Sequence, residues 1–258
     1  MSALLRRFAC VLIFVPAVSF LGQQTSAPPT LAGDMRELVE TPAVSGYEQQ
    51  VAEKIAARLK SFSPKVDAQG NVTVTFGSGA PHRLIVAPLD EPGFVVSRIT
   101  PEGYLQLQRL PQGGNLPLFN ELYATQPVKI ATPQGAWING AVAGVNVHLF
   151  PQRQHPPSMA DLDNMYVDVG AASAQQARSG GADVLSPLAL DRKFYEMANG
   201  RWTSPAIGDR FGAAALLELL RSLDRTKIKG TVTFSFVAQQ WLGARGLQRL
   251  MQAQTPMS

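Results

Sequence analysis

The sequence predicts an α/β protein that is interrupted by an all-β insertion. Amphipathic helices and short apolar strands alternate in two regions, at about 31–87 and again from about 199 onward. Between them, short strand-like segments separated by Gly, Pro and Asn recur every ~8–12 residues, which is typical of a small barrel or sandwich. With 45% hydrophobic and 16% charged residues, the 258-residue chain has a globular composition, with room for one large domain or two smaller ones.

Residues 1–27 have the pattern of a secretory signal peptide. Arg6 and Arg7 precede an apolar run over Phe8–Leu21, and a polar exit follows. The run is short for a bilayer span, which takes ~20 residues, although an uncleaved anchor is the alternative. Cleavage would remove Cys10, the only cysteine. We therefore expect an exported protein of the bacterial periplasm or exterior, with no disulfide and no stable membrane span after processing.

The α/β elements begin after this segment. Helical spacing covers Leu31–Glu40, and a second amphipathic helix over Tyr47–Leu59 follows a Pro- and Gly-containing turn. Asn71–Phe76 alternates apolar and polar residues, which predicts a half-buried strand. Leu84–Ala87 is a continuous apolar run, which predicts a central strand buried on both faces.

The insertion and the last α/β elements complete the chain. Short β-rich segments are expected at 94–99, 104–107, 127–131, 136–143 and 166–169. A helix-like stretch begins after Ser173, a plausible N-cap. Helical spacing returns at 211–223, followed by an apolar strand at 231–237 and a helix at 247–251.

Most chemistry-bearing residues lack the spacing of a known site. The histidines show no metal-ligand spacing and are expected in surface loops; they are His82, His148 and His155. Ser45 lacks the G-x-S-x-G pattern of a serine hydrolase, and Gly77–Gly79 lacks the helix of a phosphate loop. Asp161 and Asp163 are expected to be solvated. No Lys/Arg run exceeds two residues, so nucleic-acid binding is not predicted.

One acidic pair stands at a position where active sites form. Asp90 and Glu91 directly follow the apolar run that ends at Ala87. Catalytic groups and ligands of α/β folds collect at the carboxyl ends of strands. Adjacent carboxylates there could serve as a base or hold a metal, or they could only cap the strand end. The residues alone leave both interpretations open.

Seven segments, in order and with similar gaps, carry a resemblance to a known family. They are residues 37–48, 67–72, 87–96, 166–173, 199–201, 206–212 and 239–246. Together they resemble the tetrahedral, dinuclear-metal aminopeptidases, also called glutamyl aminopeptidases or, misleadingly, endoglucanases. The resemblance runs from about Leu31 to Gln252.

This resemblance implies a three-layer α/β/α domain with a mixed sheet, interrupted by a small barrel-like domain that mediates dimerisation and higher assembly. We expect a signal peptide at 1–27, the first part of the α/β domain at 28–92, the inserted domain at 93–198 and the second part at 199–258. The resemblance also implies two divalent metals, usually zinc or cobalt, that share a bridging carboxylate and a water. A Glu would act as the general base on that water.

Residue by residue, the implied chemistry is not carried over. Pro88 stands where the family has a His ligand, so Asp90, which would orient that His, has nothing to orient. Gly208 stands where the family has the bridging Asp. The neighbouring Asp209 could serve only if the backbone were rearranged, because adjacent side chains point in different directions.

The general base and another ligand are also replaced. Gln240 stands where the family has the catalytic Glu, and a neutral amide cannot take a proton at neutral pH. Trp241 stands where the family has a ligand Glu, and it offers only an N–H donor. The other Asp and His ligands lie further along in the family. We therefore expect no bound metal and no other cofactor.

Three hypotheses remain. The first is a non-catalytic relative that keeps the fold and its assembly surfaces. The second is an active exported aminopeptidase that acts on peptides with a zinc or cobalt pair, through Asp209 or with a second chain completing the site. The third is a binding or assembly module, as a homo-oligomer or as a subunit for a partner peptidase, that uses the inserted β domain.

Overall fold

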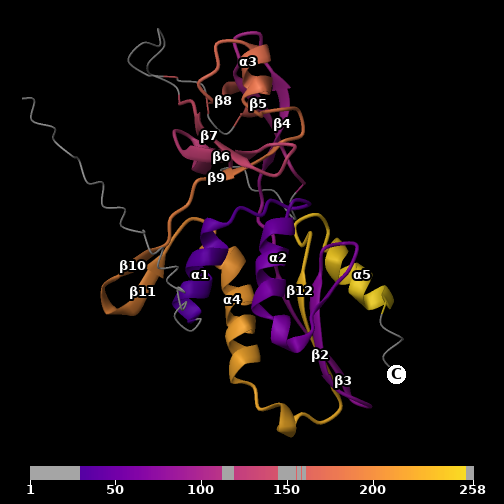
Figure 1. Cartoon of the computed structure of the whole chain (residues 1–258). Helices are drawn as coiled ribbons and strands as arrows, with labels where there is room; N and C mark the ends of the chain where they lie inside the picture. Colours follow the sequence, from indigo (N-terminus) through magenta and orange to yellow (C-terminus); the bar gives the residue numbers. More distant parts are fainter. Residues whose placement is uncertain (1–29, 112–118, 145–154, 156–157, 159–160, 254–258) are drawn as a thin grey trace, which may run out of the picture.

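A computed structural model describes residues 30–111, 119–144, 155, 158 and 161–253. The described chain forms an α/β part and a closed barrel, which stand one above the other in Figure 1. The predicted signal peptide, with Cys10, and His148 lie outside the described residues. Within the described ranges, no helix combines the length and apolar character needed to cross a membrane.

The α/β part is built on a four-stranded mixed sheet in the order β1-β2-β12-β3. The strands are β1 (Lys65–Val66), β2 (Val72–Gly77), β3 (His82–Pro88) and β12 (Thr231–Val237). β12 lies between two strands from the beginning of the chain, antiparallel to β2 and parallel to β3. Its register pairs Val237 with Pro88, so the carboxyl ends of β12 and β3 meet at one edge of the sheet.

The prediction of a central strand at Leu84–Ala87 is wrong. β3 pairs with β12 along one side only, and among the described residues no strand pairs with its other side. Ile85 and Val86 are consequently 38% and 40% exposed. An apolar run reports that a strand is apolar on both faces, but it does not report how many neighbours the strand has.

Helices cover the sheet from two sides. α1 (Leu31–Glu40), α2 (Gln49–Arg58) and α4 (Ile207–Ser222) share one hydrophobic core with the sheet, and α5 (Arg245–Ala253) lies beside the other side of it (Figure 1). This arrangement confirms the expected three-layer architecture. α4 begins four residues before the predicted helix, so Gly208 and Asp209 lie in its first turn.

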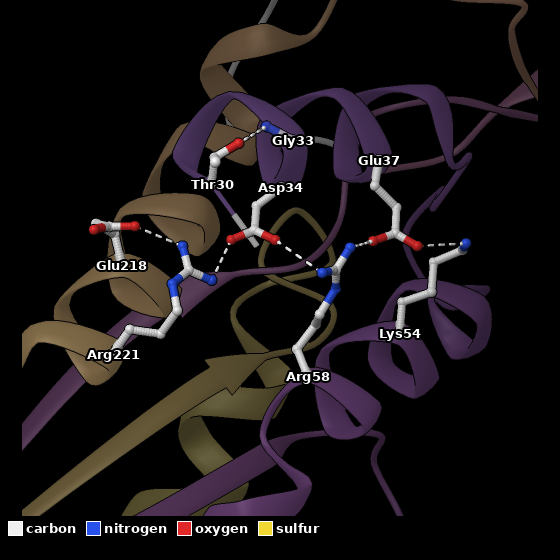
Figure 2. Close-up of polar contacts among 8 residues, drawn as sticks. All are labelled: Thr30, Gly33, Asp34, Glu37, Lys54, Arg58, Glu218 and Arg221. Carbon is white, nitrogen blue, oxygen red and sulfur yellow. Dashed lines mark hydrogen bonds and ion pairs between the residues drawn. The ribbon is translucent and has the colours of Figure 1, made fainter. Parts of the chain in front are cut away.

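Charged side chains join α1, α2 and α4 (Figure 2). Asp34 of α1 is only 1% exposed and lies between two arginines: its Oδ2 is 2.5 Å from Arg221 Nη1 of α4, and its Oδ1 is 3.8 Å from Arg58 Nη1 of α2. Arg58 also contacts Glu37 at 2.5 Å, and Lys54 contacts Glu37 at 3.0 Å. The network fixes three helices over the same face and thereby holds α4 in position.

The insertion is a closed barrel with its own core, in the strand order β4-β5-β8-β7-β6-β9. Its strands are β4 (Phe94–Ile99), β5 (Leu105–Arg109), β6 (Pro127–Ala131), β7 (Trp137–Val142), β8 (Tyr166–Asp168) and β9 (Pro187–Leu190), with the short helix α3 (Ala174–Ser179) beside them. All lie inside the predicted insertion, although its boundaries at 93 and 198 stay a prediction.

Smaller elements were not expected from the sequence. A hairpin of β10 (Tyr195–Met197) and β11 (Arg201–Thr203) follows the barrel. Single 3-10 turns occupy Lys60–Phe62, Asn120–Tyr123, Leu162–Asn164, Ala198–Gly200 and Arg225–Lys227.

Candidate functional site

The positions singled out in the sequence converge at the carboxyl ends of β3 and β12. Pro88 ends β3, while Gln240 and Trp241 follow β12. The N-terminal part of α4 packs against the end of β3, because an added Cβ at Gly212 would lie 3.8 Å from the Pro88 ring. The Trp241 side chain lies close enough to Asp209 to lower its pKa, so the loop after β12 lies beside α4. The structure therefore brings the replaced family positions to one place.

Asp90 lies at the centre of this place and is completely buried. Its Oδ1 accepts the backbone N–H of Gln240 at 2.9 Å, and its Oδ2 accepts the backbone N–H of Trp241 at 3.0 Å. The Ser45 hydroxyl donates to Oδ2 at 2.5 Å. Three donors from two distant segments thus hold the Asp90 carboxylate and join the turn before α2 to the loop after β12. Asp90 acts here as a structural acceptor.

Glu91 is tied into a second cluster beneath the site. Its Oε1 accepts the Ala43 backbone N–H at 3.0 Å, and its Oε2 contacts Arg192 Nη1 and lies 3.2 Å from Arg210 Nη2. Arg192 also donates to Val39 O at 2.9 Å, in α1. Carboxylate and guanidiniums are all at least 96% buried. This cluster joins β3, α4, α1 and the segment after β9.

Burial acts on both arginines, and the like charge of Arg210 acts on Arg192 as well. Burial, together with the charge of Arg210, lowers the pKa of Arg192 to about 9. Burial lowers the pKa of Arg210 to about 10. Both guanidiniums remain charged at neutral pH, so Glu91 offsets much of the cost of burying two cations.

Two further carboxyls border the site. Burial raises the pKa of Asp209, although Arg210 and Arg192 act in the opposite direction. Burial also raises the pKa of Glu48, whose Oε1 accepts the backbone N–H groups of Gly46 at 2.8 Å and Gln239 at 2.9 Å. In the barrel core, burial and then the Asp209 charge raise the pKa of Tyr123.

The residues present do not fit the implied pair of metals. Pro88 and Gly208 carry no donor atom, and the Trp241 indole can only donate. The Asp90 oxygens already accept three hydrogen bonds, and the Glu91 oxygens face a backbone amide and two cations. Across the described ranges, no group of three or more His, Cys, Asp and Glu side chains is placed to hold a metal ion. The described residues therefore do not supply a site for metal-based chemistry.

The other candidates lie away from this place or outside the described chain. His82 is exposed, but it begins β3 rather than lying in a loop. His155 is also exposed. Asp161 accepts the backbone N–H of Asp163 at 3.0 Å, and both side chains are exposed, as expected for a solvated turn.

Sequence reasoning missed the residues that complete the site. Arg192 belongs to no recognisable motif. Arg210 and Glu48 lie within two of the seven matching segments, but the sequence did not single them out as site residues. A weak signal did exist for Ser45 and Glu48, because both flank Gly46 in the first of the seven segments. Their contacts with Asp90 and Gln239 depend on pairing across 45 and 191 positions of sequence.

The fold and the site define a metallopeptidase-type α/β domain with an inserted barrel and altered ligand positions. The sequence profile of the M42 glutamyl aminopeptidase family matches residues 70–257, and the chain belongs to this family. This confirms the resemblance derived from the seven segments.

Individual relatives agree with this assignment. The lysyl aminopeptidase of Pyrococcus furiosus is 29% identical over 215 residues, which cover 82% of this chain and 60% of the relative. The glutamyl aminopeptidase of Lactococcus lactis is 28% identical over 218 residues, covering 82% and 60%. The chain thus spans about three fifths of the length of these curated relatives.

Solved structures show the same fold. The TET1 peptidase of Pyrococcus horikoshii superposes with a TM-score of 0.76 at 28% identity, over 86% of this chain and 64% of that chain. That peptidase is described as able to assemble into a tetrahedron or a large octahedral shell. The aminopeptidase of Desulfurococcus kamchatkensis superposes with the same score at 26% identity, over 86% and 59%.

Proposed function

We propose that this chain is an exported, non-catalytic member of the M42 aminopeptidase family. One observation carries the proposal. The family resemblance implies metal ligands and a general base at four positions that lie together at one edge of the sheet. In this chain those positions are occupied by Pro88, Gly208, Gln240 and Trp241. A metal-activated water needs oxygen, nitrogen or sulfur donors around the ion, which these side chains do not supply.

The contacts of the remaining acids support the same proposal. Asp90 is engaged by three donors, and Glu91 is engaged by a backbone amide and two arginines. A carboxylate that ligates a metal must give up such partners. Asp209, in the first turn of α4, lies beside the Trp241 side chain, and a single acid does not make a zinc site.

Metal content and peptidase activity of the full chain test this proposal. We expect no tightly bound zinc or cobalt and no chelator-sensitive release of nitroaniline from aminoacyl-nitroanilides. The comparison is a variant with Pro88→His, Gly208→Asp, Gln240→Glu and Trp241→Glu, which we expect to gain zinc affinity. An added Cβ at Gly208 has no heavy atom within 4 Å, so the aspartate side chain fits there. A metal pair and chelator-sensitive turnover in the unmodified chain would contradict the proposal and favour the active aminopeptidase.

We also propose that the chain is an oligomer or a partner subunit that assembles through its barrel. The assembly described for the TET1 relative supports this, as does the separate hydrophobic core of the barrel. Light scattering after size exclusion, alone and with a co-produced peptidase, tests it. A strict monomer that binds no peptidase would contradict assembly.

The proposed export rests on the charge and apolar pattern of residues 1–27. Intact mass and N-terminal sequencing of the chain recovered from the bacterial periplasm test it. We expect cleavage near residue 27, whereas an uncleaved chain in the cytosol would contradict export.

A further inference from the structure

A cleft of about 570 Å³ lies where α2 meets the barrel. One wall comes from the start of α2, the second from the turn between β6 and β7, and the third from the segment before β9. The lining residues used below are Tyr47, Gln49, Gln134, Trp137, Leu185 and Pro187. Ligand sites occur preferentially at such domain junctions, and the volume lies within the ~300–1,000 Å³ usual for them.

The lining carries no charged side chain. A charged ligand would lose water here without meeting an opposite charge, which is unfavourable. Proline, leucine, valine and aromatic side chains alternate with amides and hydroxyls along the walls. The cleft therefore suits an uncharged ligand with apolar groups and hydrogen-bonding carbonyls.

Two aromatic walls are fixed by bonds within the protein. The Trp137 indole N–H donates to Gln50 Oε1 at 2.9 Å, and Gln50 Nε2 donates to Gly135 O at 2.9 Å. The Tyr47 hydroxyl donates to Leu185 O at 3.1 Å. Because these polar groups are already used across the junction, the rings offer a ligand mainly their apolar surfaces.

The third wall is strained and apolar. Leu185 has a φ of +68°, in the left-handed region that disfavours a leucine, and its side chain is 63% exposed. Its neighbour Val184 is 43% exposed. A strained backbone that presents a large apolar residue at a cleft is typical of ligand clamps.

We propose that this cleft binds an uncharged, extended, proline-containing peptide segment. Such a segment has little conformational freedom before binding, and aromatic-lined grooves recognise its ridged apolar surface. Among the described residues, the side chains of Gln49 and Gln134 make no hydrogen bond, so their amides are free to donate to peptide carbonyls. This binding does not depend on any hydrolytic activity of the chain.

Calorimetric titration of the full chain with a peptide acetyl-Ala-Pro-Pro-Leu-Pro-amide tests the proposal. We expect saturable binding, and binding weakened by about tenfold or more with Trp137→Ala, the loss typical of an anchoring aromatic. A peptide of the same length with Lys and Glu in place of Ala and Leu, and an uncharged cello-oligosaccharide, are the comparison ligands; neither should bind.

Leu185→Gly is the matched variant that separates binding from folding. Glycine adopts a positive φ without strain, so the unfolding midpoint should be unchanged or higher, whereas peptide affinity should fall. Absence of peptide binding, equal binding of the charged peptide, binding of the oligosaccharide in place of the peptide, or unchanged affinity in both variants would each overturn the proposal.

Discussion

Replacement of Glu91 by glutamine tests whether the buried cluster beneath the candidate site stabilises the fold. The substitution keeps the Oε1 acceptor for the Ala43 N–H, but at Oε2 it turns an anion into an N–H donor that faces Arg192 and Arg210. Two guanidiniums that are at least 96% buried then share no carboxylate. Breaking a buried pair in this way costs about 3–5 kcal/mol, a large part of the 5–15 kcal/mol that typically stabilises a domain.

The assay is urea unfolding followed by far-UV circular dichroism, with Glu196→Gln as the control. Glu196 forms a single pair with Arg36 at 2.7 Å, and their side chains are 57% and 45% exposed. The same chemical change should therefore cost less than about 1 kcal/mol there. If Glu91→Gln loses no more stability than Glu196→Gln, the cluster contributes nothing beyond surface pairing and the reasoning is refuted.

Three other predictions concern stability. Asp34→Ala removes a buried partner of two arginines and should lower the unfolding free energy by about 3 kcal/mol or more. Glu218→Ala, at a half-exposed pair, should cost less than about 1 kcal/mol. Equal losses in urea titrations would contradict a stabilising role of the buried network. Because the pKa of Asp209 is raised, the folded chain binds more protons at this carboxyl than the unfolded chain, and the contribution of Asp209 to stability falls as pH rises through the carboxyl range. Asp209→Asn should therefore be more stable than wild type at about pH 7 but not at about pH 4. A gain in stability that is independent of pH would count against this reasoning. Gly208→Ala should leave the thermal midpoint unchanged or higher, because no heavy atom lies within 4 Å of an added Cβ. In Gly246→Ala the added Cβ would lie 2.3 Å from a backbone oxygen, so the thermal midpoint should fall strongly. Similar midpoints for the two variants would refute the packing argument.

Periodicity predicted those helices and strands whose own residues show a regular apolar pattern. The helix at Leu31–Glu40 and the strand at Thr231–Val237 have the observed bounds, because each alternates or repeats over its full length. The barrel was equally visible from its regularly spaced turns. By contrast, α4 starts at Ile207, before its leucine stripe, because Gly208, Asp209 and Arg210 interrupt the apolar pattern in its first turn.

The features that the sequence did not predict depend on contacts between distant residues, which a local pattern does not encode. The apolar run with Ile85 and Val86 predicted a central strand, yet the exposure of these residues depends on which strands are neighbours. For Asp90 and Glu91, the sequence left a catalytic and a capping role open, and their hydrogen bonds favour the capping role. Arg192 was missed because a buried charge has no periodicity; only the three-dimensional proximity of Glu91 explains it.

The position of β12 in the sheet also has a consequence for the order in which the chain can fold during synthesis. β2 and β3 are not neighbours, and the strand that joins them ends at Val237, near the end of the described chain. All six barrel strands, by contrast, lie between Phe94 and Leu190. As the ribosome delivers the chain from its N-terminus, the barrel can close while β2 and β3 still lack their common partner. We therefore expect the barrel to fold first, and β2 and β3 to stay vulnerable to proteases until β12 has emerged.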